Sequence, residues 1–309
     1  MIPEDTQNIK QYNKVFELYQ DLGIPVDQKA EFSIHSLLNL HNQIPYKSPV
    51  FRANYYSFIF VKDGKGNYTT DEHTFHYSAN TVYFTNPGHL KAFEFLELHD
   101  AYLVTLSESF LKSNVHKDVF KEFPFLLAET IPPQTFTPEG FVEIELLYTQ
   151  ILKEYQGASS FKYQIIGNLF VVLLLKLKQN FWTDYYPLEE GNRNSQIVKT
   201  FKRHLEEHYL DLSSGDTEKH FQVKDYANAQ SLSTSYFNQV IKSKTGKPAS
   251  TWIAEKSLGQ AQALLKNSSL SIKEIAYQLG YREIAHFSNF FRKHTGLSPS
   301  KYRTQRKDR

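Results

Sequence analysis

The stretch LSIKEIAYQLGYREIAHFSNFFRKHTGLSPSKYR, residues 270–303, repeats an earlier stretch, FQVKDYANAQSLSTSYFNQVIKSKTGKPASTWI, residues 221–253. The two copies align at an offset of 49 residues before a turn and 50 residues after it. Ala227 falls on Ala276, and after the turn Phe237 falls on Phe287 and Gly246 on Gly296. A tandem duplication of this kind indicates two copies of one supersecondary unit.

Each copy has the pattern of a helix-turn-helix. A short helix carries Ala227 or Ala276, where a second helix crosses closely, and Gly280 supplies a permissive turn in the second copy. A longer helix follows, with one apolar face and one polar face. The apolar faces comprise Phe237, Val240 and Ile241 in the first copy and Phe287, Phe290 and Phe291 in the second. The polar faces comprise Ser235, Asn238, Gln239 and Lys242, and then Arg282, Glu283, His286, Asn289, Arg292 and Lys293.

These polar faces suit DNA. Asn and Gln can pair with adenine through two hydrogen bonds, and basic residues can reach phosphates. Residues 250–265 between the copies predict one connecting helix with an apolar stripe. If that helix holds the two recognition helices about 34 Å apart, they can enter successive turns of one major groove.

The net charge also differs between the two parts of the chain that meet near residue 194. Residues 194–309 hold 19 Lys and Arg against 10 Asp and Glu, a net charge of +9, whereas residues 1–193 hold 16 against 23, a net charge of −7. A basic segment joined to an acidic one favours a polyanion partner for the basic segment. The 309 residues contain no cysteine, which excludes disulfides and thiolate chemistry and favours a reducing compartment, the cytoplasm.

The C-terminal pattern over residues 196–303 resembles the AraC/XylS family of bacterial transcription regulators. That resemblance implies base contacts by Ser235, Asn238, Gln239, Ala285, His286 and Asn289. We expect phosphate contacts from Ser233, Lys242, Arg282, Arg292 and Lys293. The sequence departs from the family in the connecting helix, where Lys256 and Ser257 stand in place of the usual pair that begins with Arg.

The N-terminal half has a different pattern of apolar residues. Aromatic and β-branched runs between Glu31 and Ser107, separated by Gly, Asn and Asp, predict six to eight short strands in a small barrel or sandwich. A helix is expected over residues 8–21. From Pro138 apolar residues recur every three or four positions up to Gly157, and a second helix follows over residues 161–181. Residues 183–196, TDYYPLEEGNRNSQ, carry linker composition.

The helix over residues 161–181 is apolar on nearly every side, so its own domain can cover only part of it. We therefore expect a homodimer contact through this helix and the one before it. The alternative is a helix wholly buried within one protomer. The 13-residue apolar core of this helix is too short to span a bilayer and contains Asn168 and Lys176, so no membrane segment is expected.

The strand-rich half also resembles, more weakly, the cupin-like sensor domain that often accompanies this DNA-binding domain. The metal-binding HxH set of cupin enzymes is missing, and His73, His76, His89 and His99 lack partners at ligand spacing. We therefore expect no metal and no cofactor. The expected fold is α+β: a cupin-like β-barrel over residues 1–137, a helical dimerisation segment over 138–184, a linker over 185–195 and an all-α double helix-turn-helix domain over 196–309.

The leading interpretation is a sequence-specific, cytoplasmic transcription regulator rather than an enzyme. It would bind operator or promoter DNA as a dimer, and a small-molecule effector and RNA polymerase are possible further partners. Two alternatives remain: a cupin-type metal-dependent enzyme with an accessory basic domain, and an architectural DNA-binding protein without sequence preference.

Overall fold

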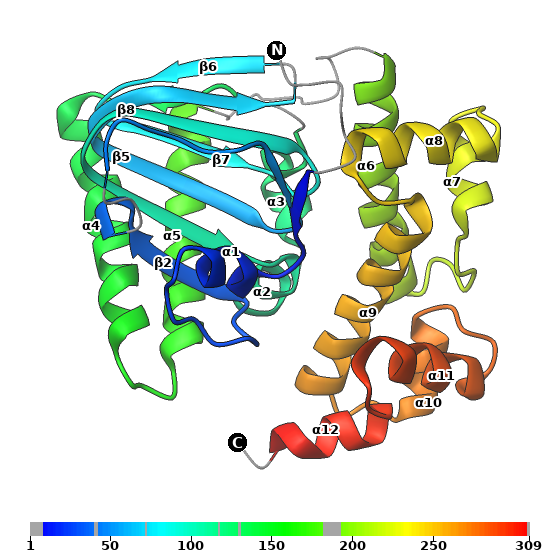
Figure 1. The fold of residues 1–309 in the computed structure, drawn as a ribbon. Helices are drawn as coiled ribbons and strands as arrows, with labels where there is room; N and C mark the ends of the chain where they lie inside the picture. Colours follow the sequence, from blue (N-terminus) through cyan, green and yellow to red (C-terminus); the bar gives the residue numbers. More distant parts are fainter. Residues whose placement is uncertain are drawn as a thin grey trace. The chain divides into compact units, whose positions relative to one another are not determined.

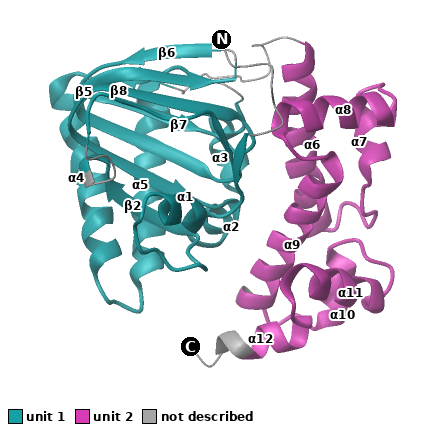
Figure 2. Ribbon diagram, viewed as in Figure 1, with its two compact units in different colours: residues 1–187 teal, residues 188–309 magenta. Residues whose placement is uncertain are grey.

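The computed structural model describes residues 9–39, 43–71, 73–116, 118–128, 131–181 and 193–307. The chain divides into two compact units, Met1–Pro187 and Leu188–Arg309 (Figure 2). The first contains a mixed sheet and helices and the second is helical, so the fold class is α+β, as predicted (Figure 1). Residues 185–192 of the predicted linker lie outside the described residues, and α6 already begins at Arg193.

One sheet runs through the N-terminal unit. Its strands are β1 (Lys10–Tyr12), β2 (Phe32–Ser36), β3 (Tyr46–Lys47), β4 (Phe51–Ala53), β5 (Tyr56–Thr70), β6 (His73–Tyr77), β7 (Thr81–Thr85), β8 (Leu90–Leu106) and β9 (Gln134–Thr135). The long strands β5 and β8 pair antiparallel from Tyr56 opposite Leu106 to Thr70 opposite Lys91. The register shifts between Val61 and Gly66, where bulges bend both strands.

The bend lets the two halves of the sheet enclose an aromatic core. Ile59 and Leu103 lie on one side of the bend, and Tyr68 and Phe95 lie on the other. All four side chains belong to one buried cluster. The opposite face of the first half, with Phe58 and its neighbours on β7 and β8, packs against helices. Because side chains alternate along a strand, one strand serves both cores.

The sheet is not closed, which corrects the predicted barrel. Its strand order is β1-β4-β8-β5-β7-β9, and within the described residues the end strands β1 and β9 do not pair with each other. β1 has three residues and β9 has two, so the sheet ends in two short edge strands instead of closing into a barrel.

The N-terminal helix α1 (Val15–Asp21) is shorter than predicted. Asn8 lies outside the described residues, and Lys10–Tyr12 form strand β1, parallel to Phe51–Ala53 of β4. Periodicity within one segment could not show this pairing, because the partner strand lies about 40 residues away.

Helices cover the first half of the sheet, as Figure 1 shows for α4 (Pro138–Gln156) and α5 (Lys162–Phe181). The shorter turns α2 (Glu108–Phe110), α3 (Val119–Glu122) and the single turns at 111–115 and 124–127 precede them. Thr137 caps α4 through the N–H of Gly140, and Pro138 occupies its first position.

Helix α5 is not wholly covered by its own unit. Phe170, Leu173 and Leu174 are fully buried against the sheet, whereas Val172 and Leu175 are 43% and 44% exposed. On the neighbouring α4, Leu146 is 66% exposed. An apolar strip on both helices therefore faces away from the core of the unit.

The C-terminal unit contains helices α6 (Arg193–Ser214), α7 (Val223–Ala229), α8 (Thr234–Thr245), α9 (Ala249–Asn267), α10 (Ile272–Gln278), α11 (Ile284–Thr295) and α12 (Pro299–Lys307). The repeat is visible as helices of equal length: α7 and α10 have seven residues, and α8 and α11 have twelve. Among the described residues, no helix is long and apolar enough to cross a membrane.

Candidate nucleic-acid interface

Helices α8 and α11 end by the same means, but only α8 has a side-chain cap at its start. The Oγ atom of Ser233 accepts a hydrogen bond from the N–H of Tyr236 at 3.3 Å and caps α8. Each helix ends at a glycine in the left-handed conformation, Gly246 at φ 78° and Gly296 at φ 75°, whose N–H bonds back to the helix. The repeat thus fixes both length and end geometry.

The inner face of each longer helix is apolar, as predicted. Phe237, Val240 and Ile241 are buried in the first copy, and Phe287 and Phe291 are fully buried in the second. Phe290, predicted as core, is only half-buried and lies against the ring of Tyr281 with 5.6 Å between centroids. Burial of these rings orients the helices and leaves the polar faces outward.

The outward face carries most of the predicted DNA-contacting side chains. Ser233, Ser235, Gln239 and Lys242 are exposed in the first copy, and Arg282, Ala285, His286, Asn289, Arg292 and Lys293 are exposed in the second. Arg282 and Glu283 were expected on the helix face but precede α11, with Glu283 as its N-cap residue. Lys242, Arg292 and Lys293 lie in the last turns, where the negative end of the helix dipole favours cations.

Asn238 has an additional role that the sequence did not reveal. Its side chain is half-buried, and its Oδ1 atom accepts a hydrogen bond from the backbone N–H of Ala249 at 3.0 Å. Ala249 is the first residue of α9. The acceptor of this amide is therefore engaged within the unit, and its Nδ2 donors are left for a base.

Tyr236 is a candidate contact that the sequence interpretation missed. It aligns with His286 in the repeat, is 38% exposed, and its hydroxyl donates to Oδ1 of Asn194 in α6 at 3.3 Å. The alignment of the copies carried this signal, because His286 was assigned at the same position. The bond to α6 holds the Tyr236 ring at the edge of the outward face.

Lys256 lies inside the scaffold rather than on the outward face. It is 4% exposed, and its Nζ atom pairs with a carboxylate oxygen of Glu206 in α6. The adjacent Ser257 is fully buried and shares a hydrogen bond with the hydroxyl of Tyr281 at 3.1 Å. The departure from the family pattern therefore falls at contacts that join α9 to α6 and to the second helix-turn-helix.

The two copies are also joined through the segment between α6 and α7. Nδ1 of His220 lies 3.2 Å from the carbonyl oxygen of Leu279, and its ring lies 5.1 Å from that of Tyr281. Gly280, at φ 75°, leaves room for this contact, since a Cβ there would lie 2.7 Å from the backbone nitrogen of His220. Relative placement of the two copies thus depends on more than α9.

A buried histidine supports this junction. The Nε2 atom of His208 accepts a hydrogen bond from the N–H of Phe221 at 3.2 Å, and the two rings stack at 3.8 Å. An Nε2 atom that accepts must carry no proton. Burial lowers the pKa of His208 to about 4, and burial also lowers the pKa of His220. Both imidazoles are therefore neutral at pH 7.

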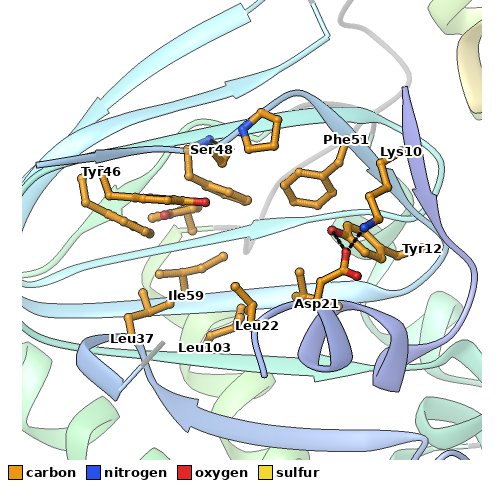
Figure 3. A pocket seen from close by; sticks show the side chains of 15 residues that line it. Lys10, Tyr12, Asp21, Leu22, Leu37, Tyr46, Ser48, Phe51, Ile59 and Leu103 are labelled. Carbon is orange, nitrogen blue, oxygen red and sulfur yellow. Dashed lines mark hydrogen bonds and ion pairs between the residues drawn. The ribbon is translucent and has the colours of Figure 1, made fainter. Parts of the chain in front are cut away.

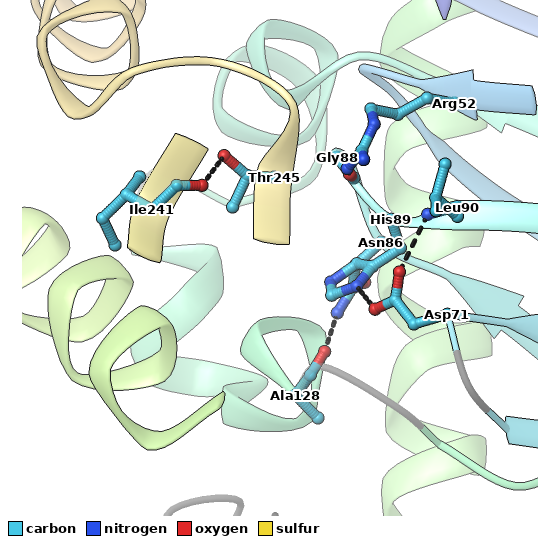
Figure 4. Close-up of polar contacts among 9 residues, drawn as sticks. All are labelled: Arg52, Asp71, Asn86, Gly88, His89, Leu90, Ala128, Ile241 and Thr245. Carbon is cyan, nitrogen blue, oxygen red and sulfur yellow. Dashed lines mark hydrogen bonds and ion pairs between the residues drawn. The ribbon is translucent and has the colours of Figure 1, made fainter. Parts of the chain in front are cut away.

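Three histidines of the N-terminal unit, which the sequence analysis considered as metal ligands, differ in burial. His89 is fully buried, with Nδ1 2.7 Å from Oδ2 of Asp71, whose other oxygen accepts from the N–H of Leu90 (Figure 4). His73 and His76 are exposed on β6. Within the described ranges, no three His, Asp or Glu side chains gather in a way that could hold a metal ion.

Comparison with known proteins places these features among regulators. A family described as a helix-turn-helix domain matches residues 226–305. The chain is 24% identical over 268 residues to the uncharacterized HTH-type transcriptional regulator YfiF of Bacillus subtilis (strain 168), covering 85% of this chain and 81% of that protein. It is 26% identical over 270 residues to the Msm operon regulatory protein of Streptococcus mutans, covering 83% of this chain and 86% of that protein.

A solved structure is similar to part of this chain. The C-terminal domain of AraT, a response regulator from Geobacillus stearothermophilus, is 27% identical, with a TM-score of 0.33. The match covers 37% of this chain and 89% of that chain. The similarity to the two curated relatives is broader, because it extends over most of this chain.

Proposed function

Because the chain belongs to the AraC/XylS family of DNA-binding transcription regulators, which are not enzymes, we propose that it reads an operator through α8 and α11. The duplicated polar faces carry this proposal, since two equal helices present side chains suited to base edges. The proposed base contacts are Ser235, Asn238, Gln239, Ala285, His286 and Asn289, with Tyr236 added from the structure.

Phosphate contacts would position these readers. We assign them to Ser233, Lys242, Arg282, Arg292 and Lys293, all of them exposed. The hydroxyl of Ser233 accepts from the helix backbone and keeps its own proton to donate to a phosphate oxygen. The excess of 19 basic over 10 acidic residues in residues 194–309 supports binding to a polyanion.

The test is selection from random duplexes with the full-length protein, followed by sequencing. Two recognition helices in successive turns of one groove predict an enriched site with two half-motifs about 10 base pairs apart. No enriched motif would contradict sequence reading and favour the architectural alternative.

We further propose that the protein acts as a homodimer in the cytoplasm. The exposed strip on α4 and α5, with Val142, Leu146, Val172 and Leu175, supports the dimer, because surface apolar clusters of this kind mark protein interfaces. A dimer would place four recognition helices on one operator and raise the effective concentration of the second DNA-binding unit. RNA polymerase contact would follow from promoter binding.

The N-terminal unit is proposed to be the sensor of a small-molecule effector, on a cupin-like sheet that is open rather than barrel-shaped. Residues 1–193, which include this unit, have an acidic net charge of −7, and this charge separates the role of the unit from DNA contact. The domain boundaries proposed for these roles are residues 1–137, 138–184, 185–195 and 196–309.

A further inference from the structure

The duplicated helices α8 and α11 differ in charge at their start. Residues 233–245 of the first copy contain no acidic residue, whereas residues 283–295 of the second contain one, Glu283. Glu283 aligns with Ser233, and each is the N-cap residue of its helix. The side chain of Glu283 is 66% exposed. A carboxylate therefore stands at the surface where the first copy has a hydroxyl.

The carboxylate of Glu283 does not cap its helix. Ser233 accepts the N–H of Tyr236 through its side chain, whereas the side chain of Glu283 makes no such bond to the backbone of α11. Its Oε2 atom lies 3.7 Å from Nε2 of His286, which is longer than a hydrogen bond. The carboxylate thus lies beside a side chain assigned to base contact, and its lone pairs remain available to a donor outside the chain.

A carboxylate at this place opposes DNA binding unless it meets a donor. The phosphates of DNA are negative, and the other exposed charges of this copy, Arg282, Arg292 and Lys293, have the sign that suits them. The N-terminal residues of a helix that reads DNA meet base edges in the major groove. A carboxylate that loses water there requires a hydrogen-bond donor in return.

The donors of the major groove are amino groups of two bases. They are N4 of cytosine and N6 of adenine. Adenine also presents the N7 acceptor beside its amino group, and this acceptor repels a carboxylate oxygen, whereas cytosine presents no acceptor on that edge. A carboxylate at the start of α11 is therefore suited to cytosine.

We propose that Glu283 determines specificity by selecting cytosine in the half-site that α11 reads. The proposal rests on the proposed reading of an operator by α8 and α11, and it adds the base that one side chain recognises. Because Ser233 stands at the equivalent position of the first copy, the preference belongs to one half-site only. That difference fixes which half of the site each copy occupies.

Three variants separate reading from support of the helix, since a carboxylate also interacts favourably with the positive end of a helix dipole. Glu283→Gln keeps the size and removes the charge, and its amide can pair with adenine. Glu283→Ser supplies the N-cap residue of the first copy, which stabilises a helix start. Glu218→Gln, at an exposed carboxylate between α6 and α7, is the control with the same change in net charge.

The test begins with selection from random duplexes by the full-length wild-type protein. We expect a cytosine at one position of one half-motif. Four duplexes that differ only in the base pair at that position are then titrated by fluorescence anisotropy. The wild type and Glu218→Gln should bind the cytosine duplex about tenfold more tightly than the other three. Glu283→Gln should bind the cytosine and adenine duplexes alike, and Glu283→Ser should bind all four alike.

Denaturant unfolding of each variant is measured beside the titrations. Loss of the cytosine preference in both Glu283 variants, with unfolding midpoints near that of the wild type, supports the proposal. An unchanged preference in both variants overturns it and leaves reading by α8 and α11 intact, and loss of the preference only together with loss of folding also overturns it. A wild-type protein that enriches no motif overturns the proposed function and this assignment together.

Discussion

The Oδ1 atom of Asn238 in α8 accepts a hydrogen bond from the backbone N–H of Ala249, the first residue of α9, at 3.0 Å. At the equivalent positions of the second copy stand Ser288 and Pro299. Proline has no N–H, so this bond cannot form there. Helix α8 is thus tied to α9 by a contact that the second copy lacks.

Substitution of Asn238 and its neighbour should separate support from reading. Asn238→Ala leaves the Ala249 N–H without its partner and should lower the free energy of unfolding by about 1 kcal/mol. Gln239→Ala, at an exposed position, should change stability by less than about 0.5 kcal/mol yet cost roughly 1 to 3 kcal/mol of affinity at the selected site. Denaturant unfolding and DNA titration measure the two quantities. Equal losses for Gln239→Ala on selected and random duplexes would remove it from the base readers.

Phosphate contacts should appear in the salt dependence. Lys242→Ala and Arg292→Ala should each reduce the slope of log K against log salt by about 0.9 and weaken selected and random duplexes alike. Lys153→Ala, at an exposed lysine of α4, is the matched control and should leave the slope unchanged. Fluorescence anisotropy between 50 and 200 mM salt gives the slopes. If one of these substitutions leaves the slope unchanged, the substituted side chain does not contact the phosphate backbone of the DNA.

The junction between the two copies should be sensitive to one methyl group. Gly280→Ala adds a Cβ 2.7 Å from the His220 nitrogen at a residue with φ 75°, so it should cost about 2 kcal/mol or more of stability. Gly296→Ala is the matched control, because φ is also 75° but no described atom lies within 4 Å of the added Cβ. It should cost about 1 kcal/mol. Similar unfolding midpoints for the two variants would contradict the close contact at His220.

Stability of the C-terminal unit should depend on pH through His208. Its pKa is about 4 in the folded chain and about 6.5 when unfolded, so the unfolded chain binds the extra proton first. Stability is therefore full above about pH 6.5, falls as pH decreases toward 4, and levels off below. His208→Gln keeps a side-chain acceptor for Phe221 and should flatten this dependence, with a remainder from His220, whose pKa burial also lowers. An unchanged pH profile in His208→Gln would show that His208 is not the group responsible.

The exposed strip on α4 and α5 gives the test of assembly. Leu146→Glu and Val172→Glu replace side chains that are 66% and 43% exposed, so the protein should stay folded and become monomeric by light scattering. Leu173→Glu, at a fully buried position of the same helix, should instead unfold the unit. A wild-type chain that is monomeric at micromolar concentration, alone and on DNA, would contradict the dimer.

Local patterns predicted the helices better than the contacts between them. The duplication and the spacing of Phe237 and Phe287 predicted α8 and α11 and their buried faces, because amphipathic periodicity is a property of a single segment. The bond from Asn238 to Ala249 and the ion pair of Lys256 with Glu206 join different helices. Periodicity assigns a polar residue to a face but does not identify its partner.

For the same reason, the sequence predicted the strands but not that the sheet is open. Alternating aromatic residues predicted strands between Glu31 and Ser107, and the structure has them, but closure depends on which edges meet. The three-residue β1 pairs with β4, and β9 pairs with β7, so the edges remain apart within the described chain. A cavity of the N-terminal unit likewise combines Lys10 and Asp21 with distant Phe93, which no single stretch of sequence could indicate (Figure 3).

The most direct measurement of the central claim is the affinity of the full-length protein for its selected duplex and for random duplex of the same length, at one physiological salt concentration. Sequence reading by α8 and α11 predicts a ratio of about a thousandfold or more. Equal affinities for the two duplexes would contradict the claim that this protein is a sequence-specific regulator.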